Sequence, residues 1–380
     1  MKPRVLFASL SVPGMGGSST AAYDLFTRMG EDGGTVHFLN LVEQHRAALV
    51  ECNYGPAAGN PRALPNVHNH WLPRGFLAPQ PELSALVGAL DPDIIIGVGW
   101  IAAGALLRAA PGRRTALLTG SCRSAQDYVT AGRAKNVVSL IGKLRASRDM
   151  SLRLSAGERD VYQSCNLVLT HSPQTCELVQ RFFPRALGKI YPEVFWFAEW
   201  ICDGARVWTH HARSFDQRDI DVLFIATDWS RREKNFPLLK ALARRFCHAT
   251  VHVVGEASGL PPSVTHHGFV AERERLFDLL GRARCVVCPS LMDAAPGVLF
   301  EAAVLGCNVV ASGNCGNWEL CHPDLLADPF ELERFADCID RAVRRKYEDR
   351  LDRFLAPSSY DSFVRTIAAF ASPFEARPER

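Results

Sequence analysis

The feature that most constrains the fold of this chain is the alternation of short apolar runs with helical patterns. Runs that are apolar almost throughout are typical of parallel strands buried on both faces, because helices cover both sides of such a sheet. In the first half of the chain the candidate strands are 4–10, 35–42, 93–99, 114–120 and 167–172. The series restarts with candidate strands at 221–228, 250–256, 284–290 and 307–313. The sequence therefore predicts an α/β protein with two parallel sheets.

The segment 196–219 breaks both periodicities and separates the two series. A chain of 380 residues, of which 47% are hydrophobic, is also long enough for two cores. We expect two Rossmann-like, doubly wound domains at 1–200 and 220–346, joined by a linker at 201–219. Helices at 347–380 are expected to pack back on the first domain. Two such domains would face each other across a cleft with the carboxyl ends of their strands, where ligands bind.

Composition excludes several classes of protein. The formal net charge of +3 gives no warrant for a nucleic-acid partner, which usually requires a strong basic excess. No apolar run approaches the roughly 18 residues that span a bilayer. The N-terminus superficially resembles a signal peptide, but its short apolar run ends in a glycine turn, so a first buried strand explains it better.

The stretch 132–155 mixes basic and apolar residues at helical spacing. It could touch an anionic membrane surface or acceptor, or simply face solvent.

Twelve cysteines raise the question of disulfides and metals. Cys285, Cys288 and Cys307 lie inside apolar strand-like runs, which favours free, buried thiols in a reducing cytoplasm. Cys285 and Cys288 form a CxxC, yet a zinc site would need a second ligand pair at suitable spacing. The HNH at 68–70 is better explained by an exposed edge strand. We therefore expect no metal site and a cytoplasmic protein, with peripheral contact at the inner face of the membrane as an alternative.

A glycine-rich turn follows the first candidate strand. Gly16 and Gly17 lie in GMGGSS, ahead of a helical pattern whose unpaired amides would suit a phosphate or polar groups of an acceptor. The turn nearly matches the dinucleotide fingerprint, with Ser19 at the third glycine position and Glu43 where a ribose-binding acid would lie. Taken alone, it could also be a turn that only packs a helix on a sheet.

A basic turn follows the first strand of the second series. Arg231, Arg232 and Lys234 lie in TDWSRREKN, between that strand and a helical pattern. Cations at this strand end could neutralise a diphosphate and stabilise it as a leaving group. The alternative is a solvated basic turn.

The stretch PSLMDAAPGVLFEAA at 289–303 places Asp293 and Glu301 on either side of a helix start. Pro296 suits the first helical turn, and Gly306 suits the residue after the helix. We expect the amides of Gly297, Val298 and Leu299 to be free at the positive end of this helix, ready for an anion. The two carboxylates would then reach hydroxyls on either side of a bound phosphate, as in a nucleotide sugar.

These motifs resemble the retaining nucleotide-sugar glycosyltransferases of family 4, which have the GT-B fold. The likeness rests on DAAPGVLFE, the RREKN turn, GMGG and SGNCGNWEL, and it is good over 221–322 and architectural before that. It implies that the first domain binds the acceptor. It also implies that Asp293 holds donor-sugar hydroxyls, Glu301 the ribose, and Arg231 with Lys234 the diphosphate.

The same resemblance extends to further positions. Gly16 and Gly17 match the family's N-terminal glycine loop, and Gly316 and Glu319 stand near the donor. Many relatives have a histidine after the fifth strand, where this chain reads TGSCRSAQDY. Ser121 or Arg123 could occupy that space. His171, at the end of another strand, is a further candidate, although a lone histidine there is more often a structural hydrogen-bonding group.

The resemblance implies that a hexosyl or related group passes from a UDP-, GDP-, ADP- or TDP-sugar to a small molecule or glycan, with retention of configuration. No cofactor or metal is required for that reaction, because basic residues and helix amides neutralise the phosphates. Three alternatives stay open: a nicotinamide-dependent two-domain dehydrogenase, a non-hydrolysing sugar-nucleotide epimerase and a non-catalytic nucleotide-binding subunit. The sequence gives no indication of the oligomeric state.

Overall fold

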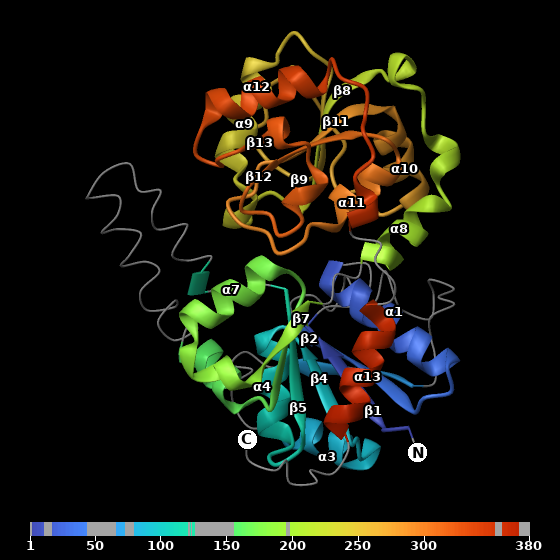
Figure 1. The fold of residues 1–380 in the computed structure, drawn as a ribbon, viewed down its shortest axis with the longest axis vertical. Helices are drawn as coiled ribbons and strands as arrows, with labels where there is room; N and C mark the ends of the chain where they lie inside the picture. The colour runs from blue at the N-terminus through green and yellow to red at the C-terminus, as the bar shows by residue number, and fades with distance from the viewer. Residues whose placement is uncertain are drawn as a thin grey trace, which may run out of the picture.

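The structure is a computed structural model of the protein. It describes residues 2–10, 17–43, 66–72, 80–120, 122, 124–125, 156–194, 198–353 and 359–371. The described chain forms two units, each built on one sheet (Figure 1). The first sheet has seven strands in the order β3-β2-β1-β4-β5-β6-β7, and the second has six in the order β10-β9-β8-β11-β12-β13. Neighbouring strands are parallel in both sheets, which confirms the predicted α/β fold class.

The first sheet is covered on both faces. Its strands are β1 (Val5–Ser9), β2 (Val36–Glu43), β3 (Val67–Leu72), β4 (Ile94–Val98), β5 (Thr115–Thr119), β6 (Leu167–Thr170) and β7 (Ile190–Val194). Its helices are α1 (Gly17–Glu31), α3 (Pro81–Leu90), α4 (Trp100–Ala109) and α7 (Pro173–Phe182). Alternate β1 side chains enter different clusters: Phe7 packs with residues of α1, and Leu6 packs with residues of α3 and α4. The apolar runs predicted β1, β4 and β5 because every residue of these three strands is buried.

Helix α13 (Ser359–Ala371) returns to the first sheet after the chain has completed the second (Figure 1). Tyr360, Phe363 and Ile367 lie in the same apolar cluster as β1 and α1. The Tyr360 hydroxyl donates to Asp32 at the end of α1 at 2.5 Å. Arg114 donates to the backbone carbonyl of Phe370 at 2.6 Å. Residues distant in sequence thus complete one face of the first sheet.

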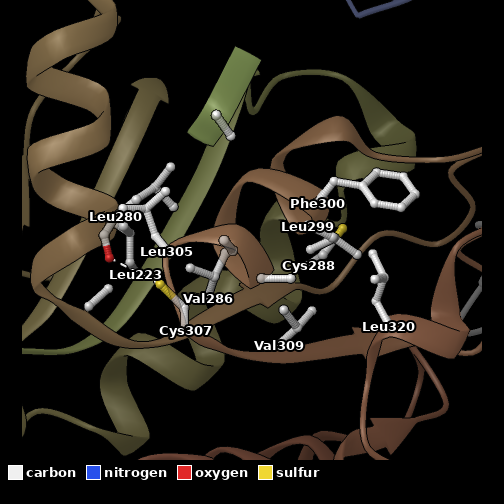
Figure 2. Packing of buried hydrophobic residues seen from close by; sticks show 14 of the residues in the cluster. Leu223, Leu280, Val286, Cys288, Leu299, Phe300, Leu305, Cys307, Val309 and Leu320 are labelled. Carbon is white, nitrogen blue, oxygen red and sulfur yellow. Dashed lines mark hydrogen bonds between the residues drawn. The ribbon is translucent and has the colours of Figure 1, made fainter. Parts of the chain in front are cut away.

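The second sheet has its own two cores. Its strands are β8 (Ile220–Asp228), β9 (Val251–Glu256), β10 (Val264–His266), β11 (Ala283–Cys288), β12 (Asn308–Ser312) and β13 (Leu326–Ala327). Its helices are α9 (Phe236–Arg245), α10 (Arg273–Arg282), α11 (Gly297–Val304) and α12 (Leu332–Ala342). Helices α10 and α11 pack on one face, where Leu223, Val286 and Val309 lie in one cluster with Leu280 of α10 and with Leu299 and Phe300 of α11 (Figure 2). Helices α9 and α12 cover the other face.

Short or peripheral strands were the ones that apolar runs did not predict. Strand β3 does lie at the edge of its sheet, as expected for the HNH stretch. Strands β7, β10 and β13 were not predicted, and β10 and β13 have only three and two residues. Within the described residues, the chain contains no helix of the length and apolarity that a bilayer crossing demands.

Residues 198–219, which precede the second sheet, contain α8 (Ala198–Arg206) and two short 3-10 turns. Arg218 is only 4% exposed, and its guanidinium donates to the backbone carbonyls of Arg213, Ala283 and Leu305. This side chain therefore ties the end of the connecting segment to β11 and α11.

Candidate functional site

The loop after β11 contacts the strand ends of the first sheet. Met292 lies in one apolar cluster with Trp100, Leu117 and Tyr162 of the first unit. A methyl group built on Gly316 would lie 2.6 Å from the hydroxyl of Ser172, which follows β6. The loops after β11 and β12 thus approach the carboxyl-end side of the first sheet where the sequence predicts a site.

Lys234 and Asp293 form an ion pair at this junction. Lys234 ends the short 3-10 turn after β8, and Asp293 follows β11, the neighbouring strand. The Lys234 ammonium donates to Asp293 Oδ2 at 2.5 Å, and the two side chains are 17% and 18% exposed. Burial lowers the pKa of Lys234, but the charges of Asp293 and Cys288 and the hydrogen bond to Asp293 together outweigh burial, so the net shift of the pKa is upward. The lysine therefore carries a fixed positive charge between the two strand ends.

Asn235 fixes the turn that presents Lys234. Its backbone is left-handed, with φ of 60°, and its side chain is fully buried. The side-chain amide donates to the carbonyl of Pro289 at 2.8 Å and to that of Pro329 at 3.0 Å. In addition, the amide of Leu291 donates to the carbonyl of Glu233 at 2.7 Å. The turn after β8 and the loop after β11 are therefore joined by hydrogen bonds on both sides of Lys234.

The loop after β12 holds Asp293 from the other side. The Asp293 amide donates to the carbonyl of Asn314 at 3.1 Å, and the Gly316 amide donates to the carbonyl of Asp293 at 2.8 Å. A Cβ at Gly316 would lie 1.5 Å from the carbonyl oxygen of Ala294, so only glycine fits there. The structure thus brings Gly316 beside Asp293.

Helix α11 carries Glu301, whose side chain is 15% exposed. Glu301 Oε1 accepts from Arg273, the first residue of α10, at 3.4 Å. Burial raises the pKa of the Glu301 carboxyl, and the charge of Arg273 opposes that rise. Arg273 belongs to none of the motifs that stand out in the sequence, because its partner comes from a helix 28 residues away.

The start of α11 differs from the sequence expectation at one amide. Pro296 is the N-cap, and the amide of Leu299 donates to its carbonyl at 3.1 Å. The expectation of a free amide is therefore wrong for Leu299, because the first turn closes in 3-10 fashion. A methyl group on Gly297 would lie 3.5 Å from Ile201, so α8 approaches this end of the helix. The side-chain amide of Asn317, which is fully buried, donates to the carbonyl of Pro296 at 3.0 Å and so holds the N-cap of α11 in place.

Other candidate residues lie around this centre. Arg231 pairs with Glu233 on its own turn, and its side chain is 52% exposed, so it is not fixed as Lys234 is. Glu319 lies in a short 3-10 turn next to the exposed Trp318. Gly17 begins α1, while Gly16, Ser121, Arg123 and the stretch 132–155 lie outside the described residues.

His171 follows β6 at the same junction and is 7% exposed. A methyl group on Gly120 would lie 3.0 Å from the Nδ1 of His171 and 3.6 Å from the Ala294 side chain, so Gly120 lies between His171 of the first unit and Ala294 of the second. Burial lowers the pKa of His171 to about 4, which keeps the ring neutral at physiological pH. Neighbouring Ser172 caps α7 by accepting from the Thr175 amide, a role that SPQT in the sequence would have indicated.

Among the residues that the structure describes, no group of three or more His, Cys, Asp or Glu side chains is arranged to hold a metal ion. Cys285, Cys288 and Cys307 are buried free thiols.

Residues 220–345 match the family model described as glycosyl transferases group 1. The chain is similar in structure to α,α-trehalose 6-phosphate synthase from Burkholderia multivorans, at 14% identity and a TM-score of 0.61, over 100% of both chains. It is also similar to sucrose-phosphate synthase from Thermosynechococcus elongatus, at 17% identity and a TM-score of 0.60, over 97% of this chain and 93% of that one.

HepE from Anabaena, solved in complex with UDP and glucose, matches at 16% identity and a TM-score of 0.58, over 97% of this chain and 93% of HepE. The chain has the GT-B fold. Identities this low show the fold alone, and a search of curated proteins finds no match. The matched domain and the GT-B fold together support a glycosyltransferase.

Proposed function

We propose that the protein transfers a sugar from a nucleoside-diphosphate sugar to an acceptor with retention of anomeric configuration, as a family 4 enzyme. The observation that carries the proposal is the Lys234–Asp293 pair, which lies at adjacent strand ends inside the segment that matches group 1 glycosyltransferases. A fixed cation there would neutralise the departing diphosphate, and a neighbouring carboxylate would accept from sugar hydroxyls.

The other roles follow from this placement. Glu301, one turn into α11, would accept from the ribose hydroxyls, and Arg231 would add a second cation when the diphosphate is bound. Gly316 would let the backbone approach the donor closely. HepE, whose structure holds UDP and glucose, is the neighbour that favours such a donor. We propose residues 220–346 as the donor domain and residues 1–200 as the acceptor domain, with 201–219 as the linker.

The reaction would need no metal, because Lys234 and the start of α11 neutralise the phosphates. It would also need no cofactor beyond the donor. The buried thiols favour a reducing cytoplasm as the place of action. The basic stretch 132–155 is the segment that would contact an anionic membrane or acceptor.

A panel of UDP-, GDP-, ADP- and TDP-sugars tests the donor. We expect one of them to raise the melting temperature and to be hydrolysed slowly in the absence of an acceptor, with activity unchanged by a chelator. Proton NMR of the first sugar released should show the anomer of the donor. Stabilisation by NADH alone would overturn the proposal in favour of a dehydrogenase. Conversion of the donor to an epimer, without free sugar, would favour an epimerase.

Two variants separate binding from chemistry. Glu301→Gln should weaken binding of the free nucleoside diphosphate, whereas Asp293→Asn should mainly reduce turnover of the donor. Glu333→Gln, on the exposed face of α12, serves as the matched control. Equal and negligible effects of the first two substitutions would remove both residues from the site.

A further inference from the structure

We propose that Arg273 is a positioning residue that holds Glu301 as an oriented carboxylate for the donor ribose. The inference rests on the proposed function and deepens it. It adds a residue from α10 to a site whose other members follow β8, β11 and β12 or lie on α11.

Arg273 and Glu301 are joined by a side-chain hydrogen bond between two helices. Arg273 Nη2 donates to Glu301 Oε1 at 3.4 Å, so α10 reaches across to α11. The guanidinium also lies 5.1 Å from the ring centroid of Phe277, one turn further along α10, which limits where it can move. A methyl group on Gly204 of α8 would lie 4.0 Å from the same Nη2. The guanidinium thus lies against Glu301 of α11 and Phe277 of α10, with α8 close by.

The exposure of the two side chains is unequal. Arg273 is 50% exposed, whereas Glu301 is 15% exposed. An ion pair with one half-exposed partner contributes little to folding stability. Its effect on Glu301 is larger, because a carboxylate removed from water depends on its few remaining partners to stay ionised. When one oxygen accepts from Arg273, the other can accept from a sugar hydroxyl.

Other charged groups near Glu301 belong to the segments packed around it. On α8, the buried thiol of Cys202 is influenced by Glu301, with Asp203 and Arg206 on the same helix. Asp349, beyond α12, acts on that thiol as well. Arg273 is the charge that opposes the upward shift which burial imposes on the pKa of Glu301.

Titration calorimetry of the full chain with free UDP, GDP, ADP and TDP selects the tightest of these probes. Its dissociation constant is then measured from pH 5 to pH 8.5 for the wild type, Arg273→Gln and Arg273→Lys. Arg275→Gln is the matched control, since Arg275 is an exposed residue of the same helix. Melting temperatures of all variants are recorded in parallel.

A carboxylate acceptor loses affinity as the pH falls through its pKa. Without Arg273 that pKa rises, so the loss should begin at a higher pH. We expect Arg273→Gln to bind about tenfold more weakly than the wild type near pH 5.5 and within about twofold near pH 8, since one pKa unit is a tenfold change in ionisation. Arg273→Lys should fall between the two, and Arg275→Gln should match the wild type.

Two further experiments test whether Arg273 acts through Glu301 and the ribose hydroxyls. In a Glu301→Gln background, Arg273→Gln should have no additional effect, and the same should hold for a 2′,3′-dideoxy form of the probe. An equal loss at every pH, or a full effect of Arg273→Gln in the Glu301→Gln background, would overturn the inference. If the wild type binds none of the four probes, the proposed function fails and the inference fails with it. If the wild type binds and Arg273→Gln is unchanged, only the inference fails.

Discussion

The ammonium of Lys234 lies 2.5 Å from the carboxylate of Asp293, across the ends of two adjacent parallel strands. Each side chain is less than one fifth exposed, so each charge depends on the other for most of its stabilisation. The pair also depends on two neighbouring loops, through Asn235 on one side and the backbone of Asn314 and Gly316 on the other. Binding of a diphosphate would give Lys234 a second anionic partner at a position that is already fixed.

The first prediction concerns the stability of this pair. Asp293→Asn should lower the free energy of unfolding by about 3 kcal/mol, because it leaves the ammonium buried without a counter-charge. Lys234→Met should have a comparable effect for the opposite reason. The double variant should lose clearly less than the sum of the two. Urea unfolding of all three proteins measures this coupling, and strictly additive losses would show that the two charges do not interact.

The second prediction concerns the close backbone approach at Gly316. Gly316→Ala should lower the free energy of unfolding by at least about 2 kcal/mol and abolish donor turnover, because its Cβ would overlap the Ala294 carbonyl. Gly313→Ala is the matched control in the same loop, since a Cβ there meets open space. Thermal unfolding and donor hydrolysis measure the two effects. Equal behaviour of both variants would show that the Ala294 carbonyl does not crowd this position.

The third prediction separates two contributions of Asn235. Asn235→Gly keeps the left-handed backbone but removes the side-chain hydrogen bonds to Pro289 and Pro329. It should cost about 1 to 3 kcal/mol. Asn235→Ala should cost about 1 kcal/mol more, because alanine also resists this conformation. Both variants should raise the KM for the donor through Lys234. An alanine variant as stable as the glycine variant would argue against backbone strain at this turn.

The fourth prediction is a pH dependence of stability. His171 has a pKa of about 4 in the folded protein against an ordinary value of 6.5, so the unfolded chain binds this proton first on acidification. Its contribution to stability is complete above pH 6.5 and is lost as the pH falls toward 4, at up to about 1.4 kcal/mol per pH unit. His171→Gln should remove the part of this pH dependence that His171 contributes. The variant should keep the part that comes from His252, whose pKa is also about 4.

That comparison needs unfolding curves at several pH values between 4 and 7. If the wild type and His171→Gln lose stability in parallel over this range, His171 is already protonated in the folded protein or is accessible to water.

The fold followed from the sequence wherever burial on both faces made a strand apolar throughout. Residues 5–9, 94–98 and 115–119 are buried at every position, and each coincides with a predicted run. The strand at 190–194 was missed because Tyr191 and Pro192 interrupt its apolar pattern. The two-residue strand at 326–327 is too short to give any periodicity.

The site could be predicted in part. Local motifs drew attention to Lys234, Asp293 and Glu301, because each lies within a few residues of a strand end or a helix start. The pairing of Lys234 with Asp293 and of Arg273 with Glu301 could not be read from the sequence. The partners are 59 and 28 residues apart, and only the strand order and helix packing bring them together. The assigned roles of these residues stay predictions until the variants are measured.

Helix α13 has a consequence for how the protein is made. Its residues Tyr360, Phe363 and Ile367 belong to the core of the first sheet, yet the ribosome synthesises them after the whole second unit. During translation, the face of β1 and β4 that contains Phe7 and Ile96 therefore lacks the helix α13 that covers it in the folded protein. Exposed apolar surface of this kind is where nascent chains aggregate or bind chaperones. A nascent chain arrested before residue 359 should expose this face even when its second sheet is complete.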